Sequence, residues 1–152
     1  MDSIINILGF YRRPTRKVYV SSVPMGSDYP IRVQTMTTTN TNNIDETVEQ
    51  SIRAIESGAD FIRITSQGKK EAQSIGKVKQ ILEAKGYTTP IIADIHFNPA
   101  AALEAAKYAD KIRINPGNYA DKSRSSAIGI TDLEYEQELK RVEERFIPLI
   151  DL

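Results

Sequence analysis

Short apolar runs alternate with helix-forming segments along most of this chain, and this alternation restricts the fold more than any other feature. Three runs have the length and composition of buried strands, at 61–65, 90–95 and 111–114. The segments between them carry apolar residues three or four positions apart, which is typical of helices with one buried face. Strands and helices in regular alternation are joined by right-handed crossovers, so the pattern predicts a parallel sheet.

Residues that can cap a helix stand at the start of three of the expected helices. The helices are expected over 44–58, 70–85 and 98–108, and from 131 onward. The capping residues are Asn43, Asn98 and Thr131. Pro99, directly after Asn98, suits the first helical position because its missing N–H would be unpaired there anyway.

The last predicted helix carries an apolar stripe and then a proline. By its spacing the stripe belongs to the core, and it consists of Tyr135, Leu139, Val142 and Phe146. Pro148 is expected to break or kink this helix, because proline lacks the backbone donor. Ile150 is then a candidate start of a further strand.

Two β-rich runs precede the first helix, at 17–20 and 31–35. Proline, glycine and aspartate separate them, which predicts a strand, a loop and a returning strand. No glycine-rich fingerprint follows the first strand, which argues against a dinucleotide-binding fold. A closed barrel needs eight strand–helix units, and only four are visible. We therefore expect an α/β fold, the first half of a (β/α)8 TIM-type barrel preceded by an N-terminal β-hairpin, as one domain over 1–152.

Polar residues occupy the carboxyl ends of the predicted strands, where parallel α/β folds bind their ligands. Arg63 and Arg113 each lie among isoleucines inside a strand. They could be solvent-facing or outward-paired arginines, but an unpaired buried guanidinium is costly, and two at a barrel mouth could fork onto phosphate. We favour the phosphate interpretation.

Asp94 and His96 share one face of an extended segment, so the carboxylate could orient the imidazole and favour its charged, phosphate-binding form. A metal site is the weaker alternative, because one histidine and one aspartate are too few ligands. Asn115 could also reach the ligand. The threonine-rich run at 37–41 fits a turn and a ligand contact equally well.

The composition excludes several classes of function. Twenty basic and twenty acidic residues cancel, so no net charge points to nucleic acid, a membrane surface or an acidic partner. No apolar run is long enough for a transmembrane helix. The chain contains no cysteine, which excludes disulfides, thiolate metal sites and an iron–sulfur cluster held by this chain alone. We expect a cytoplasmic location.

Four phrases carry a resemblance to a known family: VPMGSDYPIRVQTMTTTNT, ADFIRIT, ADIHFNP and KIRINPGNY. With them the sequence resembles the N-terminal barrel region of 4-hydroxy-3-methylbut-2-en-1-yl diphosphate synthase, over nearly the whole chain. The phrases YRRPTRKVYV and EYEQELKRVEERFIPLI resemble the longer, insert-containing form of that family.

The resemblance implies an oxidoreductase of the non-mevalonate isoprenoid pathway, which reductively opens 2-C-methyl-D-erythritol 2,4-cyclodiphosphate. For the full-length family it implies a 4Fe-4S cluster and a ferredoxin or flavodoxin reductant. The substrate-binding positions that it implies are Arg63, Asp94, His96, Arg113 and Asn115. Thr37 to Thr39 and Asn118 would be further contacts.

This sequence also departs from the family pattern. The cysteines that hold the cluster are absent, and so are the later strands that bring another arginine and a lysine to the diphosphate. We therefore expect a truncated or split form, without the C-terminal half-barrel and iron–sulfur domain, that binds substrate but is inactive alone. The alternative is a non-catalytic half-barrel assembly module, and a homo-oligomer is expected. A different barrel enzyme, such as a pterin-binding synthase, fits the phrases poorly.

Overall fold

The computed structural model describes residues 13–115, 119 and 131–152. A parallel sheet of four strands has the order β3 (Gln34–Met36), β4 (Phe61–Ser66), β5 (Ile91–Ile95) and β6 (Lys111–Arg113). Each strand leads to a helix further along the chain: α1 (Ile44–Glu56), α2 (Lys69–Ala84), α3 (Pro99–Ala105) and α5 (Asp132–Ile150). Strand order equals chain order, which is the arrangement of consecutive units in a (β/α)8 barrel. The predicted half-barrel is confirmed.

An antiparallel hairpin precedes the sheet, as predicted, but its second strand is not the predicted one. β1 (Val18–Val20) pairs with β2 (Val23–Met25) across a two-residue turn in which Ser21 adopts a left-handed φ of 52°. The expected return strand at 31–35 instead leads into β3, which pairs in parallel with β4. Pro24 had suggested a loop, yet a strand with no further neighbour tolerates a residue that lacks an N–H.

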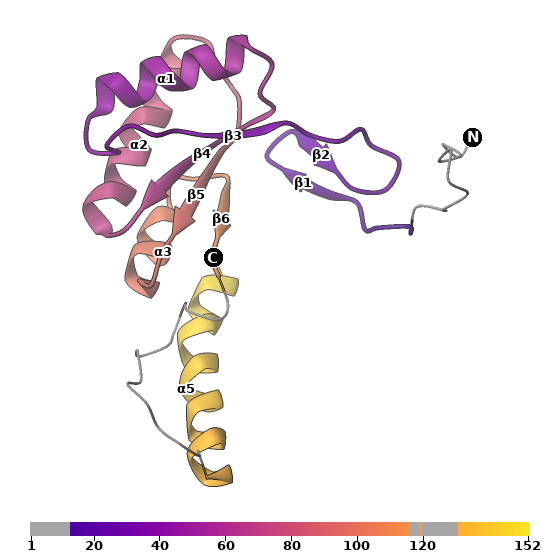
Figure 1. Cartoon of the computed structure of the whole chain (residues 1–152), viewed down its shortest axis with the longest axis vertical. Helices are drawn as coiled ribbons and strands as arrows, with labels where there is room; N and C mark the ends of the chain where they lie inside the picture. The colour runs from indigo at the N-terminus through magenta and orange to yellow at the C-terminus, as the bar shows by residue number, and fades with distance from the viewer. Residues whose placement is uncertain (1–12, 116–118, 120–130) are drawn as a thin grey trace.

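Alternate residues of the strands face two different cores. One side of the sheet packs against the helices through Ile62, Ile64, Ile91, Ala93 and Ile95, all at most 1% exposed. On the other side the hairpin residue Val20 packs against Phe61 and Ile92, which lie near the start of β4 and β5. Figure 1 shows α1, α2 and α3 on one side of the sheet and the hairpin on the other. The second face is therefore apolar where the strands begin, and its polar residues lie toward the strand ends.

The expected capping residues are confirmed. The side chains of Asn43 and Asn98 accept hydrogen bonds from the backbone N–H groups of Glu46 and Ala101, at 3.4 and 3.2 Å. Thr131 and Glu134 form a reciprocal capping box. Because these caps satisfy N–H groups that have no partner within the helix, they set where each helix begins.

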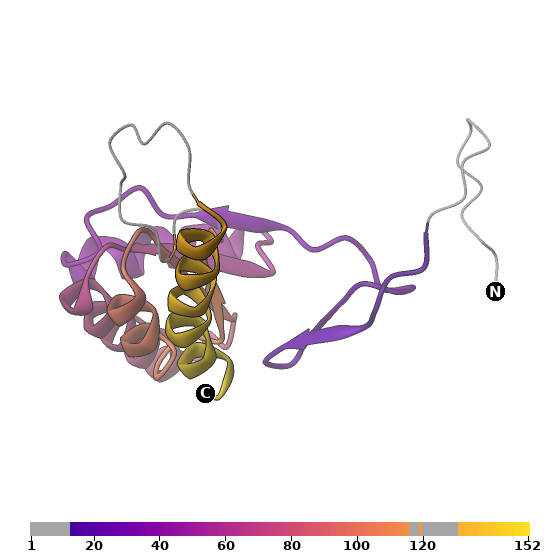
Figure 2. The ribbon, with the colours of Figure 1, turned by 90° about the horizontal axis from the view of Figure 1, so that it is seen from below.

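The break considered at Pro148 and the strand expected from Ile150 are both wrong. The helix continues through Pro148 to Ile150, so there is neither a break nor a strand at that point. Pro148 removes one backbone donor close to the helix end, and Asp151 still donates to the carbonyl of Ile147 at 3.1 Å. Figure 2 shows α5 as one unbroken helix.

The predicted core stripe on α5 is only half correct. Val142 and Phe146 pack against the core, whereas Tyr135 and Leu139 are 58% and 50% exposed. Only the C-terminal part of the helix lies against the rest of the described fold, and there α5 contacts α3.

Candidate functional site

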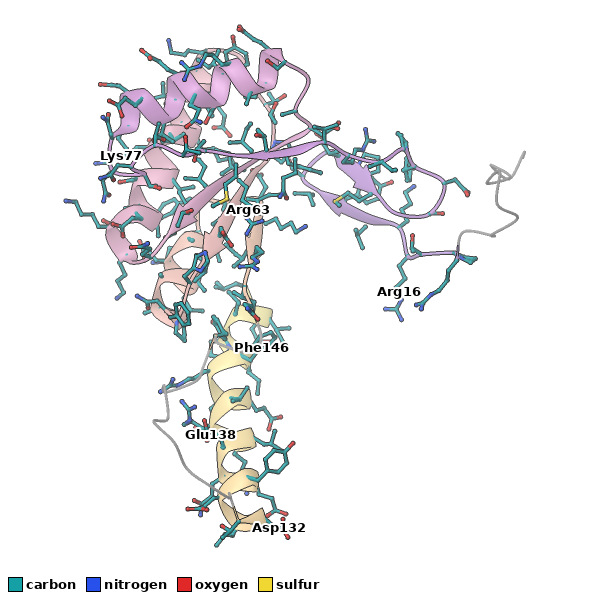
Figure 3. The ribbon with its side chains drawn as sticks, viewed as in Figure 1. Arg16, Arg63, Lys77, Asp132, Glu138 and Phe146 are labelled. Atoms are coloured by element: carbon teal, nitrogen blue, oxygen red, sulfur yellow. The ribbon has the colours of Figure 1, made fainter. Side chains whose placement is uncertain are left out.

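The strand register brings the predicted site residues to the face of the sheet that the helices do not cover. Asp94 of β5 is level with Arg113 of β6 and with Thr65 of β4. Arg63 lies two residues before Thr65, so its side chain points to the same face. Figure 3 shows Arg63 beside the strands, whereas Lys77 lies on the far side of α2.

Asp94 is the centre of the site. Its carboxylate is 1% exposed and accepts hydrogen bonds from three side chains. Arg63 Nη2 donates to Oδ2 at 2.7 Å, and Arg113 Nη1 donates to Oδ1 at 3.1 Å. His96 Nε2 lies 3.1 Å from Oδ2. We call these four residues the Asp94 cluster.

Electrostatics keep Asp94 ionised. Burial by itself would raise the pKa of its carboxyl group, but the hydrogen bonds from Arg63 and His96 outweigh burial and hold the pKa below its usual value. One carboxylate therefore faces two guanidinium groups, which leaves the cluster with an excess positive charge.

The two arginines and the histidine of the cluster keep donors available for a ligand. The side chains of Arg113 and His96 are 38% and 39% exposed, and that of Arg63 is 24% exposed. Arg63 Nε is buried and has no hydrogen-bond partner among the described residues. A guanidinium carries five N–H donors, so each arginine can hold Asp94 and still donate to an oxyanion.

The structure shows the pairing of the two arginines, and their contact with phosphate stays a prediction. They are not simply solvent-facing, because both pair with the buried Asp94, and each guanidinium has further N–H donors. Asn115 lies two residues beyond Arg113 with an exposed side chain, and its contact with a ligand stays a prediction. Asn118 lies outside the described residues.

Backbone strain accompanies the site at the end of β5. Phe97 has a φ of 54°, in the left-handed region that a bulky residue rarely adopts, and it is 70% exposed. This conformation turns the chain between His96, which faces Asp94, and Asn98, which caps α3. The sequence alone gave no sign of this strain.

A second polar feature lies beside the cluster and was only partly anticipated. The loop at 37–42 follows β3, and the N–H of Thr37 donates to the carbonyl of Arg63 at 3.0 Å. Together with Thr65, Gln67 and Glu71, this loop lines a hollow of about 520 Å³, which we call the threonine hollow. Sequence reasoning missed Glu71, and also Gln50 of α1, whose side chain holds the loop.

No group of three or more histidine, cysteine, aspartate or glutamate side chains is arranged to hold a metal ion in the part of the chain that the structure describes. Among the helices described, none combines the length and apolar character needed to cross a membrane.

Comparison with known proteins identifies the family. Residues 15–142 match the GcpE TIM-barrel domain. The 4-hydroxy-3-methylbut-2-en-1-yl diphosphate synthase (ferredoxin), chloroplastic, of Oryza sativa subsp. japonica is 48% identical over 141 residues, which are 92% of this chain and 19% of that protein. The flavodoxin-type synthase of Bacteroides thetaiotaomicron is 41% identical over 149 residues, 97% of this chain and 24% of that protein.

A third relative agrees with these two. The flavodoxin-type synthase of Protochlamydia amoebophila is 45% identical over 141 residues, which are 92% of this chain and 22% of that protein. The chain thus spans between 19% and 24% of the length of these relatives. The match to the family domain covers most of this sequence, and the parallel half-barrel agrees with it, so the chain belongs to the GcpE TIM-barrel domain family.

Proposed function

We propose that this chain is the substrate-binding part of an oxidoreductase that reductively opens 2-C-methyl-D-erythritol 2,4-cyclodiphosphate to 4-hydroxy-3-methylbut-2-enyl diphosphate. The observation that carries the proposal is the Asp94 cluster, in which two arginines and a histidine surround one buried carboxylate at the strand ends. The names of the relatives give the product, 4-hydroxy-3-methylbut-2-en-1-yl diphosphate, and the family resemblance of the sequence implies the cyclic substrate.

The residues of the cluster divide the work of binding. Arg63 and Arg113 donate hydrogen bonds to the oxygens of the diphosphate, and His96 adds a third donor from the end of β5. Asp94 does not touch the ligand in this proposal. It holds the three donors in place before the ligand arrives, which lowers the entropy cost of binding.

The 4Fe-4S cluster of the full-length family does not fit this chain. Such clusters are held by cysteine thiolates, and the sequence has none. We therefore assign binding and orientation to this chain and no electron transfer, so that it is inactive alone. The names of the relatives include ferredoxin or flavodoxin as the reductant. In this proposal the reductant delivers electrons to the part of the full-length protein that holds the 4Fe-4S cluster. We also propose a cytoplasmic location, since a chain without cysteine needs no oxidising compartment.

Calorimetry tests the proposed binding. Titration of the full 152-residue chain with the cyclic diphosphate is expected to give saturable heat, and the affinity is expected to fall as salt is raised, because charge–charge contacts are screened. Lys77→Met, which removes an exposed cation far from the cluster, is the matched control and is expected to bind as the wild type does. A folded chain that gives no heat at millimolar ligand would refute the proposal.

A second candidate function is a non-catalytic assembly module. Among the described strands, β3 and β6 each pair with one neighbour only, so the sheet has two open edges, and Ile31 and Val33 beside β3 are 82% and 57% exposed. Open edges favour pairing with another chain. Light scattering is expected to show a homo-oligomer, with a mass at least twice the 17.0 kDa of one chain. A monomer at all concentrations would count against this second candidate and leave the binding proposal standing.

A further inference from the structure

We propose that the threonine hollow is a neutral subsite, which takes the hydroxyl-bearing carbon skeleton of the ligand while the Asp94 cluster takes its phosphates. We further propose that Gln50 is the positioning residue of this subsite. The inference rests on the proposed function, because it concerns the same ligand. It adds that separate sites bind the phosphates and the carbon skeleton.

The hollow and the cluster are neighbours on β4. Thr65, which lines the hollow, is level with Asp94 in the register of β4 and β5. Arg63 lies two residues away on the same strand, and its carbonyl accepts the N–H of Thr37, the first residue of the loop. Asn98, just after the His96 turn, donates its side-chain amide to the carbonyl of Gln67 at 3.2 Å. A ligand of a few carbons bound at the cluster therefore reaches the hollow.

Charge directs the phosphates away from the hollow. Among the residues that the structure describes, no lysine, arginine or histidine lines it, and Glu71 is the one ionisable side chain. Hydrogen bonds from the backbone N–H of Glu71 itself, from the Asn42 amide and from the backbone N–H of Gly68 hold the pKa of this carboxyl group below its usual value. Glu71 is therefore an anion at neutral pH and repels a phosphate.

The same contacts use up the donors that could otherwise attract an anion. Gly68 is the N-cap of α2 and offers no side chain, so the start of this helix would be a natural place for a phosphate. The Glu71 carboxylate already occupies it, and Asn42 ties that carboxylate to the loop at 2.8 Å. The hollow is left with hydroxyl and amide groups, which suit a neutral polyol.

Gln50 fixes the shape of the hollow from α1. Its Oε1 accepts the backbone N–H groups of Thr38 and Thr39 at 2.9 and 3.3 Å, and its Nε2 donates to the hydroxyl of Thr38 at 3.1 Å. One side chain thus holds two successive peptide groups and a hydroxyl. The side chains of Thr65 and Gln67 make no hydrogen bond within the described part of the chain, so they are available to a ligand.

The experiment compares three probes on the full chain: the cyclic diphosphate, inorganic diphosphate and the neutral polyol 2-C-methylerythritol. Gln50→Ala is expected to weaken the cyclic diphosphate about tenfold, the cost of releasing one well-held hydrogen-bonding group, and to leave inorganic diphosphate within about twofold. The matched control is Gln73→Ala on the exposed side of α2, which is expected to change neither affinity.

The losses of affinity that Gln50→Ala causes for the cyclic diphosphate and for inorganic diphosphate distinguish a positioning role from a general structural role. Equal losses for both probes would show that Gln50 only supports the fold, and no loss for either would show that it does not position the subsite. Both results overturn the inference.

Amide chemical shifts of the wild type give a readout that does not depend on a variant's folding. The neutral polyol is expected to shift the amides of Thr38 and Thr39, and inorganic diphosphate those of His96 and Arg113. No polyol-induced shift in the loop overturns the subsite. A polyol response without any diphosphate response would retain the subsite and refute the proposed function instead.

Discussion

Replacing Asp94 by asparagine is expected to cost about 3 kcal/mol of folding free energy, more than any other single change in the sheet face that carries the site. Asparagine keeps the shape of the side chain but removes the charge that Arg63 and Arg113 face. Breaking a buried ion pair by removing one partner typically costs about 3–5 kcal/mol, and the partial exposure of both arginines places this case at the lower end. Denaturant unfolding measures the difference.

An exposed pair provides the comparison for Asp94. Lys107 donates to Glu104 at 2.7 Å on α3 and is 57% exposed, so Lys107→Met is expected to cost less than about 1 kcal/mol. If Asp94→Asn were as mild as Lys107→Met, the carboxylate could not be the charge that holds the two arginines in place.

The stability lost in Asp94→Asn should depend on pH, and the direction of the Asp94 pKa shift determines how. Because the folded-state pKa is below the ordinary value of about 3.9, the carboxylate stabilises the fold above that pH, and the contribution is lost as the pH falls through the folded-state pKa. The wild type should therefore exceed Asp94→Asn in free energy of unfolding by the full amount at pH 6. This difference should shrink as the pH falls below about 4. A gap that stays constant down to pH 2 would contradict the assignment.

The largest expected effect on binding belongs to the double variant His96→Ala, Arg113→Met. Each of these side chains offers a donor to an anionic ligand, and a hydrogen bond to a charged group is worth about 1.5–3 kcal/mol. Losing both is expected to weaken the cyclic diphosphate by at least about 100-fold, to the limit of calorimetric detection.

Folding and charge have to be controlled in that experiment. Arg113 also pairs with Asp94, so circular dichroism must show that the double variant is folded. Arg113→Lys keeps the charge but removes the planar fork, and it is expected to lose about tenfold in affinity in a folded chain. A folded double variant with unchanged affinity would remove the Asp94 cluster from the binding site.

The sequence predicted the strands and helices well where burial is continuous. β5 is buried from end to end, and β4 is buried except at Arg63 and Thr65; mainly apolar runs of this kind can be recognised from composition. The hairpin partner was mistaken because Pro24 is a loop signal in most contexts, and it is tolerated here in a strand that pairs on one side only. The exposure of Tyr135 and Leu139 could not be predicted, because periodicity shows which face of a helix is apolar and not how much of it has a neighbour.

Some residues of the site could likewise be predicted from the sequence, and others could not. A parallel sheet gathers its strand ends, so the meeting of Arg63, Asp94 and Arg113 followed from topology. The role of Gln50 did not, because it depends on contact between a helix side chain and a loop eleven and twelve residues earlier in the chain. No periodicity or spacing marks such a contact in a single sequence.

The left-handed Phe97 joins two structures that otherwise look independent. Only Phe97 lies between His96, whose imidazole contacts Asp94, and Asn98, whose side chain caps α3. A change in the backbone conformation of Phe97 would therefore displace both the imidazole that contacts Asp94 and the side chain that caps α3.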